Sequence, residues 1–210
     1  MPLVVVSALW TGIDVTDTFD RSAVGPNWIA WTGHSLSKGL PSIRQAIAQP
    51  PQGGLSSSAG LYGGIWVDPF TFDAQEVRFT IARGTDEHYP QIGMFAFLRC
   101  SEDSRRYVAF VVADGAVMIS RDGSTPVVDP VVTPTPAGTT FVCRAVGHRY
   151  TMSVVAGEGE TLLVEWIDLA GDVPVGSESR RWGVAVNKQT YGISGFRFSW
   201  CVDEIRARDL

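Results

Sequence analysis

The stretch YVAFVVADGAVMIS, residues 107–120, decides the fold class of this sequence. Two apolar runs are joined by the dipeptide Asp114-Gly115, which is a strong signal for a two-residue β-hairpin turn. The first run is apolar at consecutive positions, as expected for a central strand that is covered on both faces. The stretch therefore predicts two antiparallel strands inside a β-sheet protein.

The same kind of pattern continues along the chain. In EVRFTIAR, residues 76–83, apolar side chains alternate with polar ones. About ten such runs follow one another at intervals of roughly 8–12 residues, which predicts an all-β, antiparallel two-sheet jelly-roll sandwich. At most one short helix is expected, at PSIRQAIAQPP, residues 41–51, because proline suits a first helical turn and paired prolines end a helix.

The expected organisation is a single β-sandwich domain over residues 14–210, preceded by an N-terminal arm of residues 1–13. A proline-rich surface loop is predicted at residues 121–139, since its four prolines exclude a central strand. The arm is apolar, and an apolar arm of this kind can add a strand to the sheet edge of a neighbouring molecule. We therefore expect a homo-oligomer.

Composition limits the classes of function. The 210 residues are 45% hydrophobic and 19% charged, so the chain has ample material for a core. Its net charge of −5 argues against binding to nucleic acid, whose phosphates need a basic surface. No run approaches the roughly 18 apolar residues that a membrane span requires, so membrane insertion is not expected.

The order of the strand runs resembles the concanavalin A-like lectin/glucanase jelly roll, which includes laminin-G-like domains. The runs that carry the resemblance lead from YVAFVVADGAVMISRDG through FVCRAVGHRYTMSVVAGEGETLLVEW to the closing GISGFRFSWCVDEIRARDL. The N-terminal run DTFDRSAVGPNW, residues 17–28, is similar to the start of minor tail proteins of phages that infect Actinobacteria.

This resemblance implies a structural protein of the phage virion, a minor tail or baseplate component that is assembled in the host cytoplasm. Its implied partners are other tail proteins, further copies of itself and a glycan on the host surface. The alternative is a free-standing bacterial carbohydrate-binding module of the lectin type.

The run at residues 17–28 has two interpretations. If the first and last strands pair, Phe19 and Trp28 would cap the core, and Arg21 would pair with Asp17 or Asp20 to fix the turn. Alternatively, jelly rolls of the resembled group often hold a structural calcium ion where the termini meet. Asp17 and Asp203 would then supply oxygen ligands. No other cofactor is expected.

The acidic residues do not predict a hydrolase. Glycoside hydrolysis uses two carboxyl groups a few ångströms apart, and residues two apart on a strand share a face. Glu165 and Asp168 are three apart, and Glu158 and Glu160 lie in a glycine-rich turn. The Glu-x-Asp-x-x-Glu pattern of the glucanases is absent from the sequence. We therefore expect a protein that is not an enzyme.

Aromatic and polar residues in turns are the candidates for glycan binding, because sugars stack on aromatic rings and bond to nearby polar groups. Three groups qualify: Trp31 with His34; Asp86, Glu87, His88 and Tyr89; and Trp182 with Asn187 and Tyr191. The alternative for Trp31 and Trp182 is a place in the core or in a subunit contact, where aromatic residues also dominate. The alternative for the group at residues 86–89 is that it forms the tip of a β-hairpin without a binding role.

Overall fold

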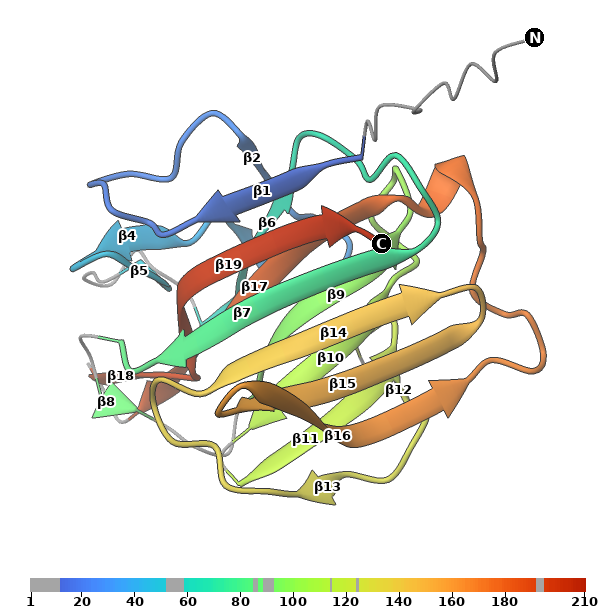
Figure 1. Ribbon diagram of the computed structural model, residues 1–210. Helices are drawn as coiled ribbons and strands as arrows, with labels where there is room; N and C mark the ends of the chain where they lie inside the picture. Colours follow the sequence, from blue (N-terminus) through green and yellow to red (C-terminus); the bar gives the residue numbers. More distant parts are fainter. Residues whose placement is uncertain are drawn as a thin grey trace, which may run out of the picture.

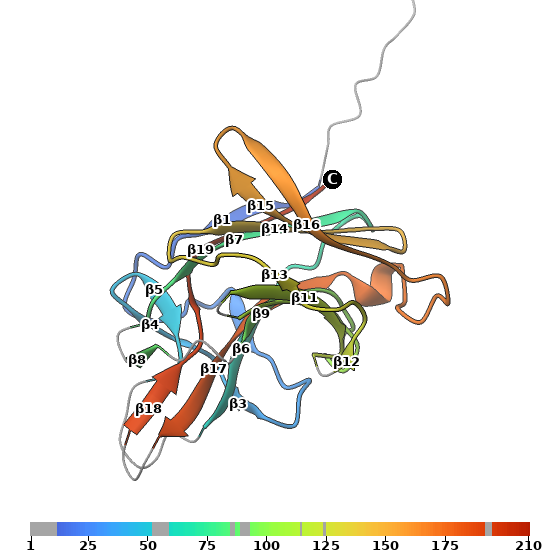
Figure 2. The same cartoon turned by 90° about the horizontal axis from the view of Figure 1, so that it is seen from below.

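Two β-sheets packed face to face make up the protein (Figures 1 and 2). The computed structural model describes residues 12–51, 59–84, 87–88, 93–113, 115–123, 125–191 and 195–210. Within these residues the helical content is one short 3-10 turn, η1 (Ser177–Ser179). No helix in the described ranges is long and apolar enough to span a bilayer. The predicted all-β, two-sheet jelly-roll sandwich is confirmed.

The described residues form an eight-stranded first sheet and an eleven-stranded second sheet. The first contains, in spatial order, β16 (Gly159–Ile167), β15 (Arg149–Ala156), β14 (Thr140–Val146), β7 (Gln75–Ala82), β19 (Cys201–Asp209), β5 (Ile47–Gln49) and β4 (Ser42–Arg44), with β1 (Asp14–Asp17) also paired to β19. The second contains β12 (Thr125–Pro126), β13 (Val131–Val132), β11 (Ala116–Arg121), β10 (Val108–Ala113), β9 (Met94–Cys100), β17 (Arg181–Tyr191), β18 (Gly195–Phe198), β8 (Glu87–His88), β6 (Gly60–Trp66), β2 (Trp28–Ala30) and β3 (Ser37–Gly39).

The predicted hairpin at residues 107–120 is confirmed. β10 and β11 pair antiparallel, with Ala113 opposite Ala116, and Gly115 in the turn has a φ of 74°, which glycine adopts readily. β10 also pairs with β9, so it lies in the interior of the sheet. Its Phe110 is fully buried between the sheets. Both faces of the strand are covered, as its continuous apolar run indicates.

The predicted helix at residues 41–51 is wrong, because these residues form the hairpin β4–β5. Gln45 and Ala46 both have positive φ values, 52° and 59°, which is the conformation of a tight two-residue hairpin turn. Ala48 of β5 pairs with Val202 of β19. Pairing with a strand far away in the sequence therefore overrides the local helical signal.

The C-terminal run, which reads as one strand in the sequence, is divided into β18 and β19. β18 belongs to the second sheet and β19 to the first, so the chain crosses between the layers at Ser199 and Trp200. Trp200 is buried at this crossing. In the proline-rich loop, β12 and β13 pair with β11 at the edge of the second sheet, consistent with the exclusion of a central strand. Residues 1–11 of the expected arm lie outside the described residues.

The core lies between the sheets and contains a cluster of three tryptophans. The ring centroids of Trp28, Trp66 and Trp182 are 5.2–5.6 Å apart in pairs. A second apolar cluster covers the other face of the second sheet, where Trp31 packs against Phe97 and Tyr107. The second sheet is thus apolar on both faces.

The run at residues 17–28 is structural, and the core-capping interpretation is confirmed. β1 pairs with β19, and Phe19 and Trp28 are buried. The carboxylate of Asp17 accepts hydrogen bonds from both terminal nitrogens of Arg21 at 2.6–2.7 Å, from the indole N–H of Trp28 at 2.7 Å, and from the backbone N–H of Phe19 at 2.8 Å. Burial alone would raise the pKa of Asp17, but these donors hold it below its ordinary value.

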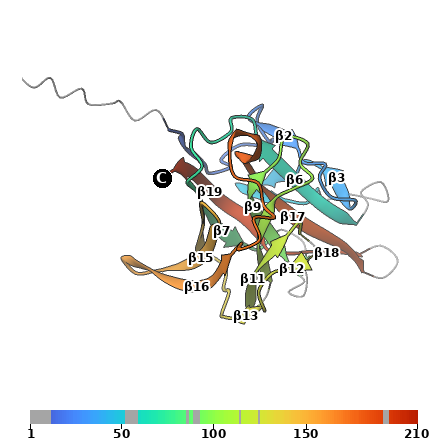
Figure 3. The ribbon, with the colours of Figure 1, turned by 90° about the vertical axis from the view of Figure 1, so that its right-hand side faces the viewer.

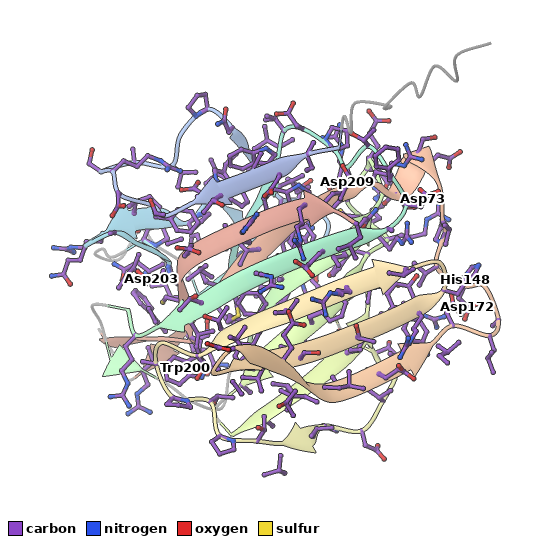
Figure 4. The ribbon with its side chains drawn as sticks, viewed as in Figure 1. Asp73, His148, Asp172, Trp200, Asp203 and Asp209 are labelled. Carbon is purple, nitrogen blue, oxygen red and sulfur yellow. The ribbon has the colours of Figure 1, made fainter. Side chains whose placement is uncertain are left out.

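The geometry gives no support to the calcium site expected at Asp17 and Asp203. Both oxygens of Asp17 are occupied, and the guanidinium of Arg21 repels a cation there. Asp203 is exposed on β19 (labelled in Figure 4). In the part of the chain that the structure describes, no group of three or more His, Cys, Asp or Glu residues is placed to hold a metal ion.

Replacing Asp17 by alanine is expected to lower the free energy of unfolding by about 2 kcal/mol, because it leaves a buried indole N–H and a partly buried guanidinium without their acceptor. Urea denaturation followed by tryptophan fluorescence measures this. Asp20→Ala is the control, since Asp20 is exposed and bonded to the exposed Thr18; its effect should stay within about 0.5 kcal/mol. Equal losses in the two variants would contradict the assignment.

The outer face of the first sheet carries an ionic network centred on Glu76 of β7. Its carboxylate is buried and accepts hydrogen bonds from the Nε atoms of Arg78 at 2.9 Å, Arg208 at 2.7 Å and Arg144 at 2.6 Å. Glu160 bonds to Arg78 and Arg144 from the other side. Burial alone would raise the pKa of Glu76, but the three arginines hold it below its ordinary value of 4.5.

Because the folded pKa of Glu76 is depressed, its contribution to stability is complete above pH 4.5 and is lost as the pH falls through the folded pKa. We expect Glu76→Gln to lower the free energy of unfolding by about 2 kcal/mol at pH 6. The difference between the two proteins should shrink towards pH 3. Denaturation at both pH values measures it, and a difference that stays constant would contradict this account.

Candidate polar cleft at one end of the sandwich

Trp31 and Trp182 do not present their rings to a ligand. Trp31 is 0% exposed and lies in the apolar cluster of the second sheet, and Trp182 is 1% exposed in the tryptophan cluster of the core. Both tryptophans are therefore buried in apolar clusters, as the alternative interpretation of these two residues states. Sequence patterns cannot separate these cases, because a tryptophan next to turn residues is common in both settings.

The other predicted site residues are not gathered into one site in the described structure. His34 is half-buried, and its ring centroid lies 6.2 Å from that of Trp31. Asn187 is half-buried on β17, five residues from Trp182, so the two side chains point to opposite faces of the strand. Asp86 and Tyr89 lie outside the described residues, and for Glu87, His88 and Tyr191 only the backbone is described, in β8 and β17.

A polar cleft lies instead at the end of the sandwich that faces the viewer in Figure 3. Asp73, His148 and Asp172 mark this end in Figure 4. The cleft has two lobes of about 260 Å³ each, which share Arg106 and Pro174. The first lobe is lined by Arg99, Ser101, Glu102, Asp103, Arg106, Pro174, Glu178 and Ser179, and the second by Arg106, Tyr107, Arg121, Asp122, Asp172, Val173 and Pro174.

Arg99 reaches the cleft because of a β-bulge at the end of β9. Cys100 pairs with Arg181 and Phe97 pairs with Gly183, so β9 has one more residue than β17 between these two pairs. Arg99 has a φ of 54°, which is uncommon for a residue other than glycine. Bulges often redirect a side chain next to a functional site. Here the bulge turns the guanidinium of Arg99 into the space between the ends of the two sheets.

Arg99 is 0% exposed and incompletely bonded. Its Nη2 donates to the carbonyl oxygen of Gly147 at 3.1 Å, and its Nη1 lies 3.8 Å from the carboxylate of Asp73. Nε and Nη1 make no hydrogen bond of good geometry within the described residues, but Asp73 and the hydroxyl of Tyr150 lie beside the guanidinium and interact with it. Burial lowers the pKa of Arg99, and the nearby Tyr150 and Asp73 offset part of this effect. The buried guanidinium thus has Gly147, Asp73 and Tyr150 as its polar neighbours.

The loop between β9 and β10 forms one wall of the cleft. The hydroxyl of Ser101 donates to Asp103 at 2.6 Å and accepts from the backbone N–H of Arg106 at 3.0 Å. The carboxylate of Asp103 also accepts from the backbone N–H of Arg105 at 3.1 Å. The hydrogen bond from Ser101 is the main reason that the pKa of Asp103 lies below its ordinary value. These bonds fix the turn that presents Arg106 to both lobes.

The opposite wall is the segment of residues 172–179. The buried carboxylate of Asp168 accepts from the backbone N–H of Val173 at 2.8 Å, and the hydroxyl of Ser179 donates to the carbonyl of Pro174 at 2.8 Å. Gln75 joins this wall to the bulge: its amide donates to the carbonyl of Ser179, and its side-chain oxygen accepts from the backbone N–H of Arg99, both at 3.2 Å. This wall and the bulge are therefore fastened to the same buried glutamine.

Sequence reasoning missed Arg99, because the run IGMFAFLRC reads as a regular strand and gives no sign of the bulge. A signal does exist: one arginine interrupts the apolar run just before its end. The other cleft residues come from three separate loops, and nothing in the spacing of those loops brings them together.

Solved structures that resemble the chain include lectins of the concanavalin A-like type, a module of a phage Dit protein and a GH43 protein of Bacillus licheniformis. The seed lectin of Lotus tetragonolobus has a TM-score of 0.60 at 11% identity, covering 93% of this chain and 97% of the lectin. The carbohydrate recognition domain of Emp47p has a TM-score of 0.57 at 13% identity, covering 93% and 94% of the two chains. The CBM2 module of the evolved Dit of Lactobacillus casei BL23 phage J-1 has a TM-score of 0.52 at 13% identity, covering 94% and 96%.

At such low identities the likeness shows the fold alone, and the fold is the concanavalin A-like sandwich that the strand order resembles. A search of curated protein sequences gives no match. One family, described as a domain of unknown function, matches residues 6–209. The chain therefore belongs to the DUF7257 family of domains of unknown function.

Proposed function

We propose that this protein is a glycan-binding module of the lectin type, carried on a phage tail, where it contributes to recognition of the host surface. The observation that carries the binding part is the cleft, in which the exposed guanidinium of Arg106 lies among the exposed carboxylates of Glu102, Asp103 and Glu178. Sugar hydroxyl groups both donate and accept hydrogen bonds, so a wall with both kinds of partner suits them.

The phage part is supported by two likenesses. The run DTFDRSAVGPNW resembles the start of actinobacteriophage minor tail proteins, and one similar structure is a CBM2 module of a phage Dit protein. On this proposal the chain is assembled in the host cytoplasm and resides in the virion tail. Its partners are other tail proteins, further copies of itself and a host glycan. The alternative, a free-standing lectin, is supported by the likeness to the Lotus seed lectin.

We propose binding without turnover. Glu165 is engaged in an ion pair with Arg149, and Glu160 is bonded to two arginines of the network around Glu76. Asp168 is buried and holds the backbone of Val173. These partners keep each of the three carboxyl groups in a structural role, whereas an acid–base pair in a glycosidase has to face the substrate.

Binding is tested by biolayer interferometry of the full chain on immobilised cell-wall polysaccharide fractions from actinobacterial cultures, together with a glycan array. We expect saturable binding to at least one fraction, and none by the same chain after heat unfolding. The absence of saturable binding to every fraction and every array glycan would overturn the proposed recognition role.

The tail role is tested by light scattering of the full chain and of a variant without residues 1–11. This deletion keeps Ile13, whose backbone N–H donates to Asp209 at 2.7 Å. A defined oligomer that becomes a monomer on deletion is expected of a tail component joined by its arm. A monomer in both cases would favour the free-standing lectin.

A further inference from the structure

One edge of the first sheet is long and open. Within the described residues, β16 is the outermost strand on this side, pairs only with β15 and extends over nine residues, Gly159–Ile167 (Figure 1). The other outermost strands of the two sheets are two to four residues long in the described structure, and β12 contains a proline. Short strands and prolines protect a sheet edge from further pairing, and β16 has neither protection.

The side chains of β16 do not protect its edge either. Glu160 and Glu165 are bonded to arginines of the first sheet, so their charges are neutralised within the molecule. The strand contains no lysine, which is the charged residue most typical of protected edges. The side chains of Leu162 and Ile167 are 53% and 48% exposed. The open edge therefore presents unpaired backbone groups together with exposed apolar side chains.

The segment of the chain that matches this edge is MPLVVVSALWT, residues 1–11, which lies outside the described residues. It contains no charged side chain. Its three consecutive valines, residues 4–6, are β-branched residues of the kind enriched in strands. An uncharged segment with high strand propensity suits an apolar edge, since neither partner has to bury an unpaired charge on pairing.

We propose that residues 1–11 of a second copy of the chain add as a strand to the open edge of β16. Main-chain hydrogen bonds supply the affinity of such a contact, and alternate side chains of the added strand pack beside Leu162 and its neighbours. The inference rests on the proposed assembly through the N-terminal arm and adds the surface that accepts the arm.

The place where the arm enters the sandwich favours a second copy over the same molecule. Ile13 is held by Asp209, and β1 lies at the opposite edge of the first sheet from β16 (Figure 1). The sheet order places β1 five strand spacings from β16, which is roughly 24 Å. Eleven extended residues span at most about 40 Å, so an arm folded back across its own sheet would keep only about four residues for pairing. A neighbouring copy can pair with the whole segment.

The same placement determines how the copies are arranged. The donor segment leaves from one edge of the first sheet and the acceptor strand is the other edge, so the contact is head-to-tail. A head-to-tail contact forms a ring when the rotation between copies closes, and an open filament when it does not. A closed ring is the arrangement that gives the defined oligomer expected of the full chain.

The acceptor edge is tested by light scattering of Leu162→Lys in the full chain, since lysine at an edge opposes strand addition. We expect the dissociation constant of the oligomer to rise at least tenfold. Val132→Lys is the matched control, because Val132 is 87% exposed on β13, an outermost strand of the second sheet. Its dissociation constant should stay within twofold of that of the unmodified chain. Both side chains are exposed, and circular dichroism checks that both variants fold.

Disulfide cross-linking tests which segment occupies the edge. Val4→Cys, Val5→Cys and Val6→Cys chains are each mixed with a Thr161→Cys chain and oxidised with copper phenanthroline; the three native cysteines are buried. We expect at least one mixture to give a cross-linked dimer on a non-reducing gel, and no dimer when Val132→Cys replaces Thr161→Cys. A chain that carries both cysteines reports the alternative, because an arm folded back on its own sheet would cross-link within the monomer.

The outcomes separate this inference from the proposed function. An oligomer that needs residues 1–11, withstands Leu162→Lys and gives no cross-link to position 161 would overturn β16 as the acceptor while leaving assembly through the arm intact. A cross-link formed within one chain would overturn the second copy as the source of the strand. If the full chain is a monomer, the proposed assembly itself fails, and the inference falls with it; the glycan-binding measurements do not depend on this result.

Discussion

The carboxylate of Asp209, at the end of the last strand, joins three segments on which the closure of the sandwich depends. It accepts hydrogen bonds from the backbone N–H groups of Ile13, Thr71 and Phe72, at 2.7–3.1 Å. The first strand, the last strand and the segment that precedes β7 are thereby joined at one point (Figure 4). That segment continues into Asp73 and Gln75, which contact Arg180, Arg99 and Ser179. Closure of the sandwich and construction of the cleft therefore use the same few residues.

The bulge at Arg99 is the costly feature of this arrangement. A non-glycine residue with positive φ costs of the order of 1 kcal/mol, and burying the guanidinium adds a desolvation penalty. Neither cost is needed to complete a sandwich, since β9 pairs regularly with β10 on its other side. Features of this kind persist where the surrounding structure enforces them, and they are concentrated at functional sites. This is the physical ground for regarding the cleft, rather than the apolar face around Trp31, as the place where a ligand binds.

Two sets of arginines in the described structure have different surroundings. Those on the outer face of the first sheet, such as Arg78, Arg144 and Arg208, surround Glu76 and are neutralised within the network. At the cleft, Arg121 pairs with Asp172 and Arg99 lies beside Asp73, whereas Arg106 makes no ion pair with a described residue. Composition cannot separate the groups, because a guanidinium in an ion-pair network and one in a binding site are the same residue in a sequence. Only the distances between charged groups in the folded structure distinguish these two kinds of arginine.

The sequence by itself determined the fold class, because alternation with period two, the Asp114-Gly115 hairpin and regular turn spacing are local properties that each strand expresses independently. It also predicted the capping role of Phe19 and Trp28 and the pairing of Arg21 with Asp17 or Asp20, all within twelve consecutive residues, and the structure selects Asp17. Tertiary structure decided the rest. The segment at residues 41–51 is a hairpin because Ala48 pairs with Val202, and Trp31 and Trp182 are buried because distant strands cover them. The cleft combines a bulge in β9 with loops from residues 101–106, 121–122 and 172–179, whose proximity depends on strand pairing across the whole chain and on no local pattern.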